Sequence, residues 1–378
     1  MEEEKNIRSE AKSKLVSAVH VSHIKQDEIQ LLAGSLGHAN VLPPSLYPVS
    51  VVKIVYNTHY QHKKVKASGL LFIPLGLSSP PPLLSAQHGT TFSKADAPSV
   101  SMAFNGMEFL ASLGYITLMP DYLGYGESAG LFHPYYEASL AAYTVIDMIL
   151  AVREYLDKEK ISYNNQLFLA GYSEGGYVTL AAQKMIEHTP SLQYLSLTAV
   201  AAGAGGYDLF GMLQGLSHNN YFSFPAYLAF IIEAYNKVYN WNKPLDYFFK
   251  NKYAEKFKTL LNGTYEGGYV NNQLPKQMDL LFNEEFYANL KGNGELQLKK
   301  ALIKNTLLNW KPISPLQLYH GTDDEIIPFK NSEDTYTAFK KNNSKDLSFI
   351  PLKGYSHTNS LLPMLASFIP WFEKIQKK

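Results

Sequence analysis

The chain has 378 residues, a formal net charge of +1 at pH 7 and no cysteine. Hydrophobic residues make up 46% of it and charged residues 18%, which suffices for one large domain or two and argues against wholesale disorder. The charge balance gives no indication of a nucleic-acid partner, and the missing cysteines exclude disulfides, thiolate metal sites and a cysteine nucleophile.

Residues 1–45 are polar and predict a partly helical lead-in. Beyond it, strand patterns alternate with helical ones, which predicts a mostly parallel sheet of about eight strands with helices on both faces. The expected strands lie at 49–57, 64–74, 83–87, 115–119, 166–170, 195–202, 316–319 and 347–352. The expected helices lie at 99–113, 136–157, 176–188, 331–342 and from 360 onward.

The alternation stops between residues 207 and 310, which are rich in Asn, Tyr, Phe and Gly. Within them, residues 224–239 look helical and apolar on more than one face. We therefore predict an α/β core formed by residues 46–206 and 311–378, with a helical cap or lid inserted at 207–310. No stretch reaches the roughly 18 apolar residues of a membrane span.

Residues 171–175 read Gly-Tyr-Ser-Glu-Gly and lie between an apolar run and a helix-compatible run. Strand, sharp turn with Ser173 at its apex, then helix is the layout of a nucleophile elbow. Side chains at Gly171 and Gly175 would collide where the helix packs behind the strand. Because a plain Gly-rich turn also produces this pattern by chance, the prediction needs a base, an acid and an oxyanion hole to accompany it.

A serine hydroxyl needs a base within hydrogen-bond reach, and the base needs an acid to hold its tautomer. In this layout the partners follow the serine in the order acid, then His, each just past a strand end. His357 follows the last predicted strand and is the only His beyond the acidic loop, so it is the candidate base. Asp323, Asp324 and Glu325 are adjacent, and any of them could reach it.

The oxyanion hole needs two N–H donors, one of which should be Glu174, the residue after the nucleophile. The other should come from the loop at residues 88–91, after the third predicted strand. The Thr90 N–H is the candidate, with Thr91 as the alternative. We expect His88 to brace this loop by hydrogen bonding.

The loop at residues 121–128 either lines the floor of the site or is an ordinary turn braced by Asp121. Residues 133–136 are expected to set the entry of the helix that follows. His188 and His218 show no metal-ligand spacing, and we expect neither a metal nor an organic cofactor.

With these residues assembled, the chain resembles the α/β-hydrolase superfamily over residues 49–204 and 312–375. The elbow, the loop after the fourth strand, the pattern H-G-x-x-D at 320–324 and the terminal His357 carry the resemblance. In that superfamily the D of H-G-x-x-D is the triad acid, which makes Asp324 the expected acid. The fold implied is that of an α/β-hydrolase.

More narrowly, the loops at 88–91, 120–126 and 133–135 look like those of secretory lipases and LipA-type esterases. Members of that group carry a helical lid between the sixth and seventh strands, and the group includes bacterial esterases secreted to act on plant cell walls. A secreted, periplasmic or cell-surface location is therefore expected, with the signal sequence absent from the chain as given.

The resemblance implies a serine carboxylic ester hydrolase that works through Ser173, His357 and Asp324 and an acyl-enzyme. Its expected substrates are short- to medium-chain or carbohydrate-linked esters, and its expected partner is a small-molecule ester of a lipid or carbohydrate. Two alternatives keep the same triad, a serine peptidase and an acyltransferase, because the triad serves any acyl transfer. A third is a catalytically idle binding module, although idle members usually lose a triad residue.

Overall fold

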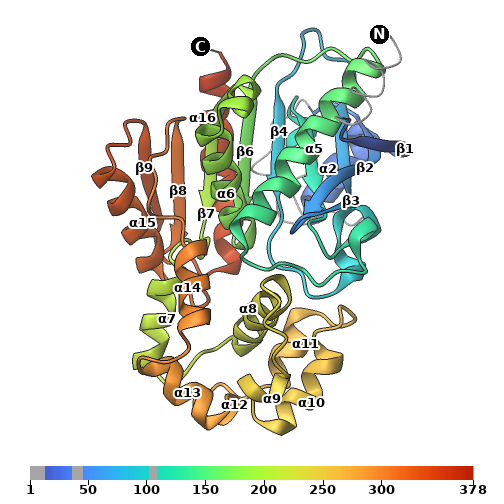
Figure 1. Ribbon diagram of the computed structural model, residues 1–378. Helices are drawn as coiled ribbons and strands as arrows, with labels where there is room; N and C mark the ends of the chain where they lie inside the picture. Colours follow the sequence, from blue (N-terminus) through green and yellow to red (C-terminus); the bar gives the residue numbers. More distant parts are fainter. Residues whose placement is uncertain (1–12, 36–45, 102–108, 378) are drawn as a thin grey trace.

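The computed structural model describes residues 13–35, 46–101 and 109–377. Its centre is a nine-stranded sheet in the order β1-β2-β3-β5-β4-β6-β7-β8-β9 (Figure 1). The antiparallel part consists of β1 (Leu15–Ile24), β2 (Val49–Tyr60) and β3 (Lys63–Pro74), and β3 also pairs antiparallel with β5. The parallel part consists of β4 (Leu83–Gln87), β5 (Ile116–Pro120), β6 (Leu167–Tyr172), β7 (Leu197–Gly203), β8 (Leu316–Gly321) and β9 (Leu347–Leu352).

The predicted α/β architecture with a mostly parallel sheet is confirmed, although the sheet has nine strands instead of about eight. The additional strand is β1, which lies inside the stretch predicted as a lead-in and pairs with β2. Val16, Val19 and Val21 are exposed because β1 is an edge strand, so its sequence lacks the apolar run of a buried strand. The lead-in prediction also covers residues 1–12 and 36–45, which lie outside the described residues.

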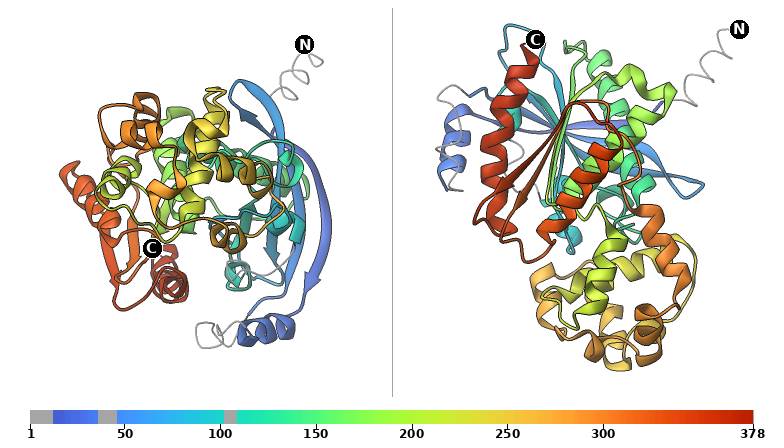
Figure 2. Two further views of the ribbon diagram at one scale, coloured as in Figure 1. Left: turned by 90° about the horizontal axis from the view of Figure 1, so that it is seen from below. Right: turned by 90° about the vertical axis from the view of Figure 1, so that its left-hand side faces the viewer.

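Helices cover both faces of the sheet (Figure 2). Because successive strand residues point to opposite faces, each central strand contributes to two cores, as Leu167 and Phe168 of β6 do. The core on the Leu167 side also includes residues of α5 (Ala138–Lys158), α6 (Glu174–His188) and α15 (Phe329–Lys341). The core on the Phe168 side includes residues of α2 (Gln26–Ser35), α4 (Phe109–Ser112) and α16 (Leu361–Gln376). Of the helix expected at 99–113, α3 (Pro98–Ser101) and α4 are described, and residues 102–108 lie outside the described residues.

Between β7 and β8, the chain forms a layer of helices at the carboxyl ends of the parallel strands (Figure 1). They are α7 (Leu209–His218), α8 (Pro225–Val238), α9 (Leu245–Phe248), α10 (Asn251–Leu260), α11 (Gly267–Asn272), α12 (Met278–Leu281), α13 (Glu284–Lys291) and α14 (Leu296–Asn305). Most of their buried apolar residues belong to the same hydrophobic cluster as α5 and α6. The role of residues 207–310 as a separate cap or lid stays a prediction. In the described part of the chain, no helix has the length and apolar character needed to cross a bilayer.

Candidate active site

Ser173 lies at the turn between β6 and α6, where the sequence predicts a nucleophile elbow. Its φ of 60° and ψ of −125° place a non-glycine residue in a strained conformation, which its N–H stabilises by a 2.9 Å bond to the Gly203 carbonyl. The flanking glycines are required by close contacts, since a Cβ at Gly171 would lie 2.2 Å from the Gly175 carbonyl oxygen. A Cβ at Gly175 would lie 2.0 Å from the Gln87 carbonyl oxygen. Only a chain without side chains at both positions can make this turn.

The structure brings His357 and Asp324 to Ser173 from the loops after β9 and β8. Ser173 Oγ lies 2.8 Å from His357 Nε2, and His357 Nδ1 lies 2.6 Å from Asp324 Oδ2. The His357 side chain is 8% exposed and that of Asp324 is fully buried. The Tyr172 hydroxyl donates to the His357 carbonyl at 2.6 Å, which fixes the backbone of the histidine. This arrangement can deprotonate the serine through the imidazole.

Of the three adjacent acids, Asp324 is the one that contacts the imidazole of His357. Its Oδ1 accepts the N–H groups of Ile326 and Ile327 at 2.9 and 2.8 Å, and its Oδ2 also faces His320 Nε2 at 3.0 Å. Burial alone would raise the pKa of the Asp324 carboxyl, but hydrogen bonds from the two histidines outweigh it and hold that pKa well below its usual range.

The other two acids lie elsewhere. Asp323 accepts a hydrogen bond from the Thr322 hydroxyl at 2.9 Å, and Glu325 accepts the backbone N–H of His357 at 3.2 Å. His320 is a neighbour of the site that the sequence reasoning did not single out. It is fully buried, and its Nδ1 lies 2.7 Å from the Ser332 hydroxyl. The sequence did contain an indication of His320, because this residue is the histidine of the H-G-x-x-D pattern.

Both predicted oxyanion donors lie beside the serine. Glu174 is the first residue of α6, so its N–H has no acceptor within the helix. Thr90 lines the same cavity as Ser173, and a Cβ placed on Gly89 would come within 3.7 Å of Ser173 Cβ. His88 braces this loop as expected, since its ring nitrogens lie 2.8 Å from the Gly89 carbonyl and 3.3 Å from the Asp121 carbonyl.

Asp121 is a bracing carboxylate, which was one of the two alternatives for the loop after β5. Its Oδ1 accepts the Ser99 N–H at 2.7 Å, and its Oδ2 accepts the hydroxyls of Ser68 and Ser99 at 2.5 Å each. It therefore ties this loop to β3 and α3. Among the residues that the structure describes, no group of three or more His, Asp or Glu side chains is arranged to hold a metal ion.

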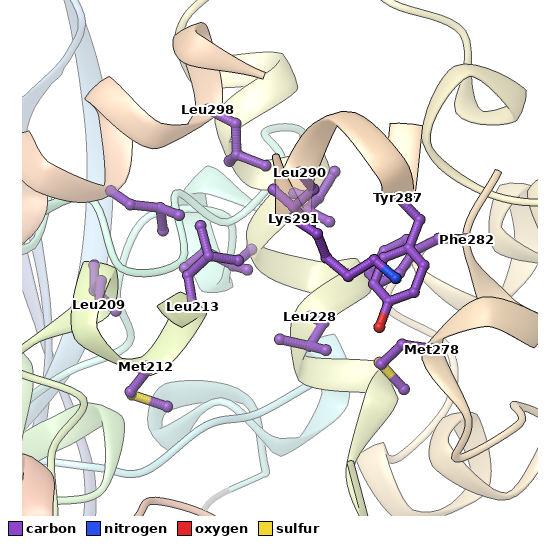
Figure 3. Close-up of a pocket in the computed structure, with 13 residues that line it drawn as sticks. Leu209, Met212, Leu213, Leu228, Met278, Phe282, Tyr287, Leu290, Lys291 and Leu298 are labelled. Atoms are coloured by element: carbon purple, nitrogen blue, oxygen red, sulfur yellow. The ribbon is translucent and has the colours of Figure 1, made fainter. Parts of the chain in front are cut away.

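Ser173 opens into a narrow apolar cavity of about 50 Å³. Its lining shares Leu209, Met212, Leu228 and Ile231 with a second apolar cavity of about 90 Å³ that lies within the helical layer (Figure 3). A wide groove of about 700 Å³, lined by both polar and apolar residues, adjoins the first cavity, with which it shares Met212, Phe222 and Ile326. The polar lining of the groove includes Asp208, Gln214, Asn219, Ser223, Glu325 and Asn331. A narrow apolar cavity and a wider groove of mixed polarity therefore meet near the serine.

The sheet carries a strained serine at a strand–helix turn, and a histidine lies within hydrogen-bond reach of both the serine and a carboxylate. These features together define the class of α/β-hydrolases. The model of the secretory lipase family matches residues 93–376, and the chain belongs to this family. Family and relatives together support a carboxylic ester hydrolase.

Three similar proteins illustrate the relationship. Lipase 6 of Candida albicans is 25% identical over 272 residues, which are 69% of this chain and 55% of that lipase, so the match spans about half the length of the relative. The rice cell wall degrading esterase LipA of Xanthomonas oryzae has a TM-score of 0.79 at 25% identity and covers 97% of each chain. A Legionella pneumophila protein described as a hydrolase has a TM-score of 0.84 at 25% identity, covering 97% of this chain and 99% of that one. The resemblance to secretory lipases and LipA-type esterases expected from the sequence is thereby confirmed.

Proposed function

We propose that this protein is a serine carboxylic ester hydrolase with Ser173 as nucleophile, His357 as general base and Asp324 as the acid that orients it. The observation that carries the proposal is the continuous chain of hydrogen bonds, 2.8 Å from Ser173 Oγ to His357 Nε2 and 2.6 Å from His357 Nδ1 to Asp324. Because Asp324 Oδ2 accepts the Nδ1 proton, the neutral His357 presents a lone pair at Nε2 toward the serine.

In the first half of the reaction, Ser173 Oγ attacks the ester carbonyl while its proton passes to His357 Nε2. The N–H groups of Glu174 and Thr90 receive the negative charge of the oxyanion. The imidazolium then donates its proton to the leaving alkoxide, which leaves an acyl-enzyme and a free alcohol. In the second half, His357 takes a proton from water, the hydroxide oxygen attacks the acyl carbonyl, and the acid departs as Ser173 recovers its proton.

The two spaces beside Ser173 suit the two halves of an ester. The narrow apolar cavity would hold an acyl chain, and its small volume of about 50 Å³ favours short to medium chains. The wider groove would hold an alcohol rich in hydroxyl groups, such as a sugar, because carboxylates and amides in its lining can bond to hydroxyls. Carbohydrate-linked esters are therefore part of the proposal, as is a cap role for residues 207–310, whose helices line both spaces. A secreted location fits the secretory lipase family and belongs to the same proposal.

The test is a panel of esters that varies the acyl chain and the alcohol, from p-nitrophenyl acetate to dodecanoate, with acetylated and feruloylated sugars. Ser173→Ala is the control, and it should lower kcat by about six powers of ten where the triad acts as a unit. Unchanged turnover in Ser173→Ala would refute the nucleophile. A rate that rises steadily to long-chain triglyceride emulsions, with activation at the oil surface, would refute the chain-length preference. Faster cleavage of a proline-linked chromogenic amide than of any ester would favour the peptidase alternative instead.

A further inference from the structure

Glu174 and His133 form a buried pair directly behind the nucleophile. Glu174 Oε1 lies 2.6 Å from His133 Nε2, and the side chains are 2% and 6% exposed. Glu174 is also the residue whose backbone N–H is proposed to face the oxyanion. Its side chain therefore extends from the oxyanion hole to His133, and whatever fixes the side chain also fixes the first turn of α6.

The hydrogen-bond geometry determines how many protons the pair holds. His133 Nδ1 lies 2.7 Å from the Leu123 carbonyl oxygen, which can only accept, so Nδ1 carries a proton and donates it. At Nε2, a lone pair cannot face an ionised carboxylate at 2.6 Å, so one further proton lies between His133 Nε2 and Glu174 Oε1. Imidazolium with carboxylate and imidazole with carboxylic acid are both neutral overall. The pair therefore places no net charge beside the oxyanion hole.

No other described neighbour is suited to neutralise the Glu174 carboxyl group. The titratable groups that face it from the surrounding elements are His88, Tyr122, Tyr125, Tyr135, Tyr136 and Tyr227. Burial lowers the pKa of His88, and burial followed by the charge of Glu174 raises the pKa of Tyr122. His133 is the ion-pair partner of Glu174 in the described part of the chain, and Glu174 Oε2 is buried there without a hydrogen-bond partner. Without His133, the carboxyl group would have no ion-pair partner among the described residues.

The loop that carries His133 also holds the opposite wall of the oxyanion hole. The Tyr135 hydroxyl lies 2.9 Å from Thr90 Oγ1, and the Tyr122 hydroxyl donates to the His88 carbonyl at 2.9 Å. The loop is held tightly, because a Cβ at Gly124, which has a φ of +93°, would lie 2.6 Å from the backbone of His133. One loop after β5 thus contacts both residues that are proposed to donate to the oxyanion.

We propose that His133 is a positioning residue for ester hydrolysis, which neutralises the Glu174 carboxyl group and aims the Glu174 N–H at the oxyanion, while Tyr135 steadies Thr90 opposite. The inference rests on the ester hydrolase function proposed above. Its physical basis is that an uncompensated carboxylate near the oxyanion repels the charge that forms in the transition state. Because this charge is absent from the bound ester, the loss of His133 should lower kcat and leave KM nearly unchanged.

Four variants test the proposal with p-nitrophenyl butyrate as substrate. His133→Gln removes the imidazole proton from the pair, and we expect kcat to fall about 10- to 100-fold with KM changed less than about threefold. This is a smaller loss than the roughly 100- to 1000-fold for removing one oxyanion donor outright. The double variant His133→Gln/Glu174→Gln removes the carboxylate as well and should recover at least about tenfold of that loss. Glu174→Asp keeps the charge but is too short to reach His133, and it should lower kcat more than Glu174→Gln does.

His59→Gln, on the exposed surface of β2, is the matched control and should leave kcat and KM unchanged. Thermal unfolding of each variant shows whether it folds, and if His133→Gln does not, the comparison of Glu174→Asp with Glu174→Gln decides. A merely structural role would not produce recovery in the double variant. If the wild type is active but His133→Gln leaves kcat unaffected, this inference alone is overturned. The same holds if Glu174→Gln is as impaired as Glu174→Asp. A wild type without Ser173-dependent hydrolysis overturns the proposed function together with it.

Discussion

Replacing Asp324 by Asn should distinguish the proposed catalytic acid from its two acidic neighbours in the chain. In the folded protein four donors converge on the Asp324 carboxylate, two backbone N–H groups on Oδ1 and the rings of His320 and His357 on Oδ2. An asparagine amide offers one oxygen and one NH2 group in their place. If its NH2 group turns toward the backbone N–H groups of Ile326 and Ile327, two buried donors will face another donor.

The size of the effect follows from this count. In that orientation each buried donor that loses its acceptor costs about 1–3 kcal/mol, so the two together should lower the free energy of unfolding by about 2–6 kcal/mol. If the amide turns its NH2 toward the histidines, His357 is forced into the tautomer that protonates Nε2, which cannot accept the Ser173 proton. The expected loss in kcat is then about 10⁴-fold, the amount measured when a triad aspartate of a serine protease is replaced by asparagine.

The assay is hydrolysis of p-nitrophenyl butyrate, with kcat referred to the folded fraction from chemical denaturation. Asp323→Asn and Glu325→Gln are the matched controls, because neither carboxylate contacts the His357 imidazole. Asp323 accepts from the Thr322 hydroxyl, and Glu325 accepts the backbone N–H of His357, which a glutamine oxygen can still accept. Each should lower kcat less than about tenfold. The reasoning is refuted if Asp324→Asn keeps more than about a tenth of the wild-type kcat, or if either control loses as much as Asp324→Asn.

Three further predictions follow from the same contacts. Gly175→Ala places a Cβ 2.0 Å from the Gln87 carbonyl oxygen and should lower the free energy of unfolding by more than about 3 kcal/mol, whereas Gly268→Ala, with nothing within 4 Å, should change it by less than about 1 kcal/mol. Equal effects in denaturant titrations would contradict the close packing at the elbow. The pKa of Asp324 is lower in the folded protein than the value of about 3.9 of an unfolded chain, so its stabilising contribution is present above about pH 4 and is lost as the pH falls below that. The free energy of unfolding of the wild type should therefore decline more steeply below pH 4 than that of Asp324→Asn, and parallel curves would contradict the shift. Ile231→Trp should fill the cavity beside Ser173 and reduce kcat/KM for octanoate by at least about tenfold more than for acetate. A uniform reduction would place the acyl chain elsewhere.

The fold was predictable where burial leaves a pattern in the sequence. The central strands β4, β6 and β7 are apolar on both faces, since helices cover both, and they were found close to their observed bounds. The edge strand β1 was missed, because exposed strand residues are not constrained to be apolar. The helical layer between β7 and β8 was predicted as a helical insertion from the interruption of the strand–helix alternation, and of its helices only α8 was located, at 224–239. Its eight helices pack mainly on one another and on the core, and their arrangement depends on contacts that no local pattern reveals.

The elbow and its partners were predictable for a different reason, which is that the turn at Ser173 and the positions of His357 and Asp324 are tied to strand ends. The choice among three adjacent acids needed the resemblance, because only the folded loop shows which carboxylate meets the imidazole. The contact between Glu174 and His133 could not be predicted from a local sequence pattern, since the two residues are 41 residues apart in the chain. From the sequence alone, an acidic residue after the nucleophile looks unfavourable for an N–H that must receive negative charge. We infer that one proton shared with His133, whose Nε2 lies 2.6 Å from Glu174 Oε1, removes the conflict, so the acidic residue at this position depends on a partner from the loop after β5.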